Sequence, residues 1–207
     1  RSRTKLKDRP LPVYTKGEEI FNMVSHIVGS AFAVGLLVFC VLRSAFHHNG
    51  WGVVTGSIFG ASMILCYVIS SVYHGLIPKT EKLIRSKKVM QVVDHCTIYF
   101  LIAGTYTPIL LLRFTANVPF VGWGLLTMQW LLGTLACVLT AVDLRKYRVF
   151  SMVCYIFMGW SIVLCLPITL QVLSPQAFSW LLAGGITYTI GAVLFGLGKK
   201  LRWMHAI

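Results

Sequence analysis

The sequence is dominated by long apolar runs separated by short polar segments. A helix needs roughly 20 mostly apolar residues to cross a bilayer, and six runs are this long: about 22–42, 52–77, 90–112, 119–142, 150–172 and 178–198. A further run begins at 203 and the chain stops at Ile207, so we expect a seventh span that is truncated in this chain. The pattern predicts an all-α polytopic membrane protein, with 1–207 forming one seven-transmembrane helical bundle.

The composition agrees with a membrane protein. Hydrophobic residues make up 57% of the chain and charged residues only 12%, which is about half the share usual in a soluble domain. The basic start is followed by a full-length span rather than by a short apolar leader, so no secretory signal is predicted. Arg1 stands where an initiator methionine is expected, which favours a trimmed chain.

The basic residues predict the orientation of the bundle. Of the 19 lysines and arginines, all but Arg43 and Arg113 lie in the first tail or in the loops after the second, fourth and sixth runs. The longest and most charged of these loops is predicted at about 78–89. Because basic loops stay on the cytoplasmic side, the N-terminus is predicted to be cytoplasmic in a multi-pass protein of the cell membrane.

The net charge of +13 raises the question of a nucleic-acid partner. The basic residues are distributed over the loops beside the spans and do not form one patch, so we predict no binding to nucleic acid. Attraction to the headgroups of anionic membrane lipids explains them better. The predicted partners are therefore membrane lipids, and the oligomeric state is left open.

Small residues inside the runs are interpreted as packing residues. All six cysteines fall within the runs and none forms a Cys-x-x-Cys pair, so we expect neither a disulfide framework nor a cysteine metal site. Gly56 and Gly60 form a Gly-x-x-x-Gly pattern, which allows two helices to approach closely.

Asp94 is the one carboxylate that lies well inside an apolar run. A charged aspartate at the centre of a membrane helix costs about 2.5–3.5 kcal/mol on insertion scales. A partner charge, a hydrogen-bond network or a metal ion must offset this cost. Such a residue is a candidate functional residue by default.

Other polar residues are expected at a similar depth in the membrane to Asp94, because each lies near the cytoplasmic end of its predicted span. They are Glu19, Asn22, His26, Ser70, His74, His95 and His205. Histidines and an aspartate in a polar pocket suit Zn²⁺, but the same residues can form a hydrogen-bonded network that only fixes helix packing. Spacing alone leaves both interpretations open. We expect His26, His95, Glu19 and Asn22 to support such a site rather than to bind a metal directly.

Several ordered motifs carry a family resemblance. They are Glu19-x-x-Asn22-x-x-x-His26, Ser70-Ser-Val-Tyr-His74, Asp94-His95-x-x-Ile98-Tyr99, Ile102-Ala-Gly-Thr-Tyr-Thr-Pro108 and His205-Ala-Ile207. Together they resemble the haemolysin III family, the bacterial branch of the progestin and adipoQ receptor superfamily that also includes the adiponectin receptors. The resemblance covers nearly the whole chain.

The resemblance implies seven transmembrane helices, a bacterial plasma membrane and a zinc site that faces the cytoplasm. The Zn²⁺ ligands would be His74 and His205, with another histidine that falls four residues after His205 and thus beyond Ile207. Asp94 matches the family aspartate that holds the zinc-bound water, and Ser70 matches a nearby serine.

The function that follows from this resemblance is zinc-dependent hydrolysis of a lipid amide or ester, since the superfamily resembles alkaline ceramidases at this site. Asp94 would be the general base, and Ser70 would orient it or the developing oxyanion. An alternative is a membrane receptor or sensor of lipid homeostasis with structural zinc. A third is a pore-forming cytolysin, which gains little support because the polar residues are confined to one half of the predicted bundle.

Overall fold

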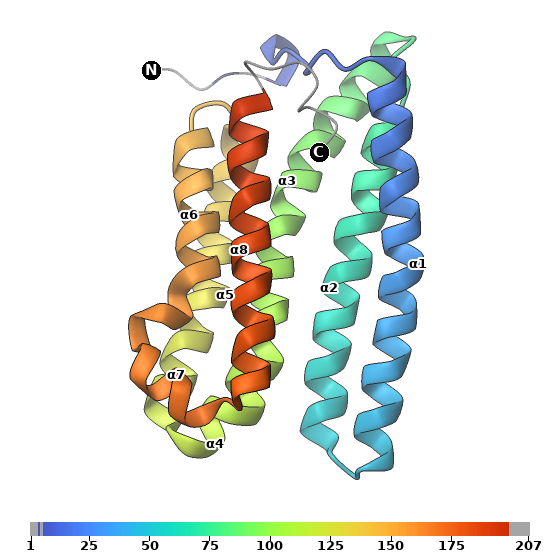
Figure 1. Cartoon of the computed structure of the whole chain (residues 1–207). Coiled ribbons are helices and arrows are strands. Elements are labelled where there is room, and N and C mark those ends of the chain that lie inside the picture. Colours follow the sequence, from blue (N-terminus) through green and yellow to red (C-terminus); the bar gives the residue numbers. More distant parts are fainter. Residues whose placement is uncertain (1–3, 5, 199–207) are drawn as a thin grey trace.

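The computed structural model describes residue 4 and residues 6–198, and in this part of the chain it contains helices and no strand. Six of these helices are long and apolar enough to cross a membrane: Lys16–Phe46, Gly50–Gly75, Glu81–Asn117, Pro119–Val142, Arg148–Val172 and Pro175–Leu194. They run roughly along one direction as a bundle (Figure 1). The all-α prediction and the six spans are confirmed. The seventh span, predicted from 203, lies outside the described residues.

The full order of elements includes five short segments beside the long helices. In chain order the elements are η1 (Leu6–Asp8), α1 (Lys16–Phe46), α2 (Gly50–Gly75), α3 (Glu81–Ile109), η2 (Leu110–Phe114), α4 (Thr115–Asn117), α5 (Pro119–Val142), α6 (Arg148–Trp160), η3 (Ser161–Cys165), α7 (Leu166–Val172) and α8 (Pro175–Gly198). We call the end that carries the starts of α1, α3 and α6 the N-terminal end of the bundle. The opposite end, with the starts of α2, α5 and α8, is the distal end.

Two helices begin earlier than the apolar pattern predicts, because polar residues cap them. The Thr15 hydroxyl accepts the Glu18 amide and the Glu18 carboxylate accepts the Thr15 amide, which is a capping box that starts α1 at Lys16. Thr80 caps α3 through the amide of Leu83. The loop predicted at 78–89 is therefore too long. Most of its charges lie on the first two turns of α3.

The lower part of α3 departs from regular helix at Pro108. Proline has no amide to continue the helical hydrogen bonds, and sharp departures from straight α-helix concentrate at such positions. The next turn, η2, is a π-helix. A similar irregularity occurs near Pro167, where η3 is a 3-10 turn between α6 and α7.

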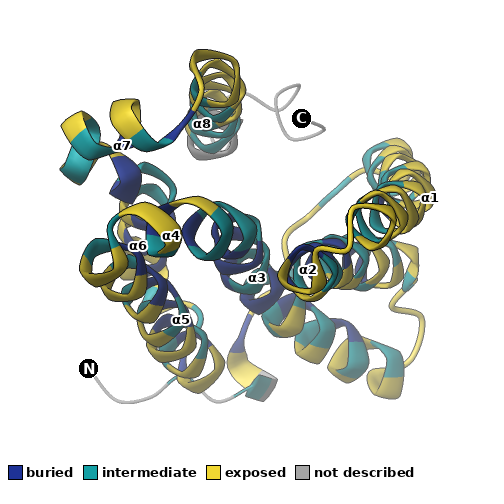
Figure 2. Cartoon of the chain, turned by 90° about the horizontal axis from the view of Figure 1, so that it is seen from below, coloured by how far each residue is buried: buried dark blue, intermediate teal, exposed yellow. Residues whose placement is uncertain are grey.

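Helix α3 occupies the centre of the bundle, and its contacts with α5 and α6 form the core. Buried residues concentrate on α3 and on the faces of α5 and α6 that are turned towards it (Figure 2). The rings of Tyr99 and Tyr155 stack with centroids 4.4 Å apart. Gln129 on α5 donates to the carbonyl of Met158 and to the hydroxyl of Ser161. Hydrogen bonds of this kind hold helices together where lipid provides no hydrophobic drive.

Helices α1 and α2 form a closely packed pair because glycine lines their contact. A Cβ added at Gly60 would lie 2.6 Å from the Leu37 Cβ, and one at Gly56 would lie 3.2 Å from the Cys40 Cβ. Side chains at these positions would push the helices apart. The close approach predicted from the Gly-x-x-x-Gly pattern is confirmed.

The segment before α1 crosses the N-terminal end of the bundle and binds the α5–α6 turn. The Thr4 amide donates to Asp143 Oδ2 at 2.7 Å, and Asp143 Oδ1 accepts the amides of Arg145 and Lys146 at 3.1 Å. Burial alone would raise the pKa of Asp143, but these amides outweigh it and hold the pKa below its ordinary value. Arg9, itself buried, donates to the carbonyl of Val142 at 3.0 Å.

Candidate functional site

Glu19 joins three helices at the N-terminal end of the bundle. Its Oε2 lies 2.7 Å from His74 Nδ1 and its Oε1 lies 2.5 Å from Lys87 Nζ. Lys87 also donates to the carbonyl of Leu76 at 2.9 Å. One carboxylate of α1 thus binds a histidine at the end of α2 and a lysine near the start of α3. We call Glu19, His74 and Lys87 the Glu19 cluster.

The local sequence explains why these side chains meet. The capping box fixes the first turn of α1 and with it the position of Glu19. His74 lies in the last turn of α2, where a positive charge is favoured by the helix dipole. Lys87 lies one turn and a half into α3 and its side chain is only 5% exposed, whereas that of Glu19 is 21% exposed. A buried lysine needs a paired charge, and Glu19 provides it.

The contact with Glu19 determines which nitrogen of His74 is available. Because a carboxylate accepts hydrogen bonds, His74 Nδ1 carries the proton that Glu19 binds. In the neutral ring, Nε2 then bears the lone pair, and no hydrogen bond to it is formed within the described part of the chain. Metal-binding histidines have this arrangement, in which a carboxylate orients the ring through the other nitrogen.

Asp94 lies on α3 two turns after Lys87, on the same face of the helix. Its Oδ2 is 3.9 Å from His95 Nδ1, but that nitrogen is already engaged by the carbonyl of Gln91 at 2.8 Å. Asp94 and Glu19 both act on the phenol of Tyr14: burial, then Glu19, then Asp94 raise the pKa of Tyr14 to about 12. The two carboxylates therefore belong to one electrostatic neighbourhood.

Two tyrosines that the sequence did not single out complete this neighbourhood. The Tyr14 ring meets the edge of the His74 ring at a centroid distance of 5.8 Å. Tyr73 is buried, and its ring lies 5.3 Å from Lys87 Nζ. The Tyr73 hydroxyl has no hydrogen-bond partner among the described residues. Ser70 is also buried, one helical turn before His74 on α2.

His26 and Asn22 lie beside the Glu19 cluster. His26 Nδ1 is 2.6 Å from the carbonyl of Asn22, one turn earlier on α1. The His26 ring stacks on that of His74 with centroids 6.0 Å apart. Glu19 shares a face of α1 with both residues, but its carboxylate reaches α2 and α3 instead.

The described residues supply only part of a metal-binding set. Among them, no group of three or more histidine, cysteine, aspartate or glutamate side chains is arranged to hold a metal ion. His74 Nε2 and the Asp94 carboxylate have suitable chemistry, but further donors would have to come from elsewhere. His205, the other histidine that the sequence proposed as a ligand, lies outside the described residues.

Lys87 was the main residue that sequence reasoning missed, because it was assigned to a loop. Its signal is helical spacing: Lys87, Gln91 and Asp94 follow one another at i, i+4 and i+7 and share one face of α3. Lys87 and Gln91 are both buried.

An all-helical chain with six apolar spans and a cluster of polar side chains near one end defines a polytopic integral membrane protein. The family model for haemolysin-III related proteins matches residues 14–206. The chain belongs to this family, as its motifs predicted.

Named relatives agree with the assignment. The chain is similar to hemolysin-3 of Bacillus cereus, with 38% identity over 191 residues that cover 92% of this chain and 83% of the relative. It is 33% identical over 195 residues to a hemolysin-3 homolog of Bacillus subtilis (strain 168), covering 94% and 87%. It is also 27% identical over 188 residues to the human monocyte to macrophage differentiation factor, covering 90% and 72%.

Proposed function

We propose that this protein is an intramembrane hydrolase that cleaves an amide or ester bond of a membrane lipid with the help of Zn²⁺. The observation that carries the proposal is the 2.7 Å contact between Glu19 and His74, which leaves His74 Nε2 available beside a carboxylate-rich neighbourhood. A bilayer delivers its lipids to any site within it. A lipid is therefore the substrate class that such a site would meet.

The chemistry of the residues fits zinc in part. His74 would bind the ion through Nε2, and His205 is proposed as a further ligand. When bound, zinc supplies a Lewis acid that polarises a carbonyl and lowers the pKa of water to about 7. The Glu19 carboxylate, held by Lys87 on its other oxygen, fixes the ring of His74 in the orientation that binding requires.

The remaining roles fall to residues near His74. Asp94 would accept the proton of the attacking water as general base, because it is a carboxylate within the same apolar surroundings. The Ser70 hydroxyl would orient Asp94 or donate to the oxyanion. Both assignments rest on position in the bundle and on the family motif.

The test is hydrolysis by the full chain in liposomes that contain a ceramide and a phospholipid. We expect fatty-acid release by the unaltered protein and at least a hundredfold loss in His74→Ala and Asp94→Asn, since a general base contributes about 10²–10⁴ in rate. His47→Ala is the control, because His47 is exposed in the turn at the distal end. Equal release by all four proteins would refute the proposal.

Metal content tests the ligand assignment separately from activity. We expect His74→Ala to lose zinc and His26→Ala to retain most of it, because His26 Nδ1 is bound to its own helix through Asn22. Equal zinc in the two variants would show that His74 is not a ligand.

A non-enzymatic role is the alternative, favoured by the way the Glu19 cluster ties α1, α2 and α3 together. Zinc would then act as a structural clamp in a receptor or sensor of lipid state. Zinc removal would lower the thermal stability of the protein, and no lipid would be turned over.

The bacterial relatives are named as a hemolysin and a hemolysin homolog, which raises a pore as a third function. We do not propose it for this chain. The centre of the described bundle is filled by apolar and aromatic side chains of α3, α5 and α6. A pore needs a polar stripe through the full depth of the membrane.

We also propose that the protein resides in a bacterial plasma membrane with the N-terminal end of the bundle in the cytoplasm. The basic residues of the first tail and of the turns at that end support this orientation.

A further inference from the structure

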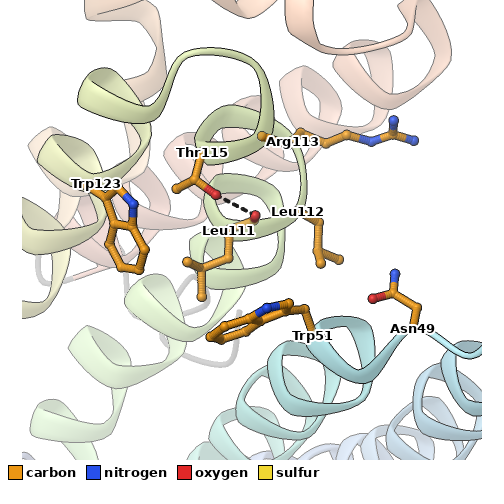
Figure 3. A pocket seen from close by; sticks show the side chains of 8 residues that line it. Asn49, Trp51, Leu111, Leu112, Arg113, Thr115 and Trp123 are labelled. Atoms are coloured by element: carbon orange, nitrogen blue, oxygen red, sulfur yellow. Dashed lines mark hydrogen bonds between the residues drawn. The ribbon is translucent and has the colours of Figure 1, made fainter.

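The distal end of the bundle has a pocket of about 620 Å³, far from the Glu19 cluster. It lies where the start of α2 meets η2 and the start of α5. Its lining includes Asn49, Trp51, Leu111, Arg113, Thr115 and Trp123. Figure 3 shows Trp123 at one side of the pocket and Asn49 and Arg113 at the other, with Leu111 and Trp51 between them.

The irregular backbone after Pro108 forms one wall of this pocket. Leu111 and Arg113 belong to the π-helical turn η2, and Thr115 follows directly. A π-turn adds one residue to each helical turn and so turns the following side chains to a new face of the helix. Such turns are rare and concentrate at functional sites.

Arg113 has no carboxylate partner at its end of the bundle. It forms no ion pair or side-chain hydrogen bond with any described residue. All six acidic side chains of the chain lie in the N-terminal segment, in the turns at the N-terminal end or, for Asp94, four turns into α3 from that end. Arg113 is exposed at this end of the bundle, so its positive charge is open to an anion from the surrounding membrane.

The pocket also has the features of a membrane–water interface. Trp51 and Trp123 are more than half exposed and lie in the first turns of α2 and α5. Tryptophan prefers the headgroup level of a bilayer. The first amides of α5 have no side-chain cap, and a helix start favours a nearby anion.

A second, apolar pocket of about 630 Å³ lies on the surface of α5. Trp123 borders both, and the second is otherwise lined by Pro119, Phe120, Gly124 and Thr127. These residues follow α5 for about 12 Å from the distal end towards the middle of the membrane. The two pockets together offer a cationic region at the interface and an apolar face of α5 that leads inward.

We propose that the two pockets bind one anionic glycerophospholipid, with its phosphate at Arg113 and one acyl chain along the start of α5. Charge complementarity selects an anion, and the apolar face of α5 selects a lipid over a free phosphate. Asn49 and Thr115 are close enough to the pocket to contact the glycerol or headgroup hydroxyls. The proposal does not depend on the hydrolase, whose site lies at the other end.

The test is lipid binding to the full-length chain in dodecylmaltoside micelles, measured by native mass spectrometry with dioleoyl phosphatidylglycerol and dioleoyl phosphatidylcholine. We expect the unaltered protein to bind phosphatidylglycerol in preference to phosphatidylcholine. Arg113→Gln should bind phosphatidylglycerol at least about tenfold more weakly, because it loses a hydrogen bond to a charged group. Arg43→Gln is the matched control, because Arg43 is an exposed arginine at the same end that lines neither pocket. We expect Phe120→Ala, which alters only the apolar pocket, to bind dihexanoyl phosphatidylglycerol normally but to lose the gain from longer chains.

Three results would overturn the proposal. Equal binding of the two lipids by the unaltered protein would remove the anion preference. An equal loss in Arg43→Gln and Arg113→Gln would indicate general attraction to surface charge. Displacement of the lipid by millimolar inorganic phosphate would identify a site for the free ion. Thermal melting of each variant in the same micelles checks that the bundle is intact.

Discussion

The Glu19 cluster gives a quantitative prediction about stability. In Glu19→Gln the amide still accepts the proton of His74 Nδ1, but the buried Lys87 ammonium loses its only carboxylate within hydrogen-bond distance among the described residues. Breaking one partner of a buried ion pair costs about 3–5 kcal/mol. Glu19 is 21% exposed, so we expect the lower limit, a loss of about 3 kcal/mol in the free energy of unfolding.

A second substitution tests whether the loss comes from the stranded lysine. Lys87→Met replaces the ammonium by an apolar side chain of similar length, and Glu19 keeps His74 as a partner. We expect this variant to lose only about 1 kcal/mol, and the double variant to lose no more than that. The two changes would then be non-additive by about 3 kcal/mol, which is the behaviour of residues in direct contact.

The measurement is unfolding in mixed dodecylmaltoside and SDS micelles, followed by far-ultraviolet circular dichroism. Glu81→Gln is the control, since Glu81 is an exposed acid in the first turn of α3 and should contribute below about 1 kcal/mol. If Glu19→Gln were as stable as the control, or if the double variant lost the sum of both single losses, the assigned ion pair would be wrong.

Four further outcomes are expected. Gly60→Ala should destabilise the bundle by about 1–3 kcal/mol in the same unfolding assay, because its Cβ would lie 2.6 Å from that of Leu37; Gly35→Ala, with open space around it, should not. Asp94→Asn should keep most of its zinc and lose lipid hydrolysis, and a fully active, zinc-loaded variant would exclude Asp94 as the base. The pKa of Asp143 is lower in the folded protein than its ordinary value of 3.8, so the ionised carboxylate stabilises the fold at pH values above 3.8. This stabilisation is lost as the pH falls through the lower pKa of the folded state. The melting temperature should therefore fall with acid in the unaltered protein, and Asp143→Asn should lack this contribution. A cysteine at the exposed Lys82 should react with an impermeant reagent from the cytoplasmic side, and labelling only from outside would reverse the proposed orientation.

The spans could be predicted closely where lipid alone determines the boundary. The fifth helix, α5, runs over Pro119–Val142, the same range that the apolar pattern gave. The pattern failed where polar residues extend a helix beyond the membrane. It placed the first span at 22–42 and the third at 90–112, whereas Thr15 and Thr80 start these helices at Lys16 and Glu81.

Some members of the candidate site could be predicted, but Lys87 and the pairing of the side chains could not. Burial and motif spacing pointed to Glu19, His74 and Asp94, which do lie near the N-terminal end. Glu19 was expected to support such a site, but its partners on α2 and α3 were not predicted. The angles at which helices cross determine such contacts, and one-dimensional spacing carries no information about them. The π-turn that forms the distal pocket was likewise not predictable beyond the presence of Pro108.

The hydrogen bond between Thr4 and Asp143 has a consequence for biosynthesis. The two residues are separated by 139 positions in the chain. The segment before α1 is the first part of this chain to leave the ribosome, but its binding site, the α5–α6 turn, is made only after four helices have been inserted. Thr4 therefore cannot form this hydrogen bond until α5 has crossed the membrane and brought Asp143 to the same side. The hydrogen bond between Thr4 and Asp143 can therefore form only after the first four spans have been inserted.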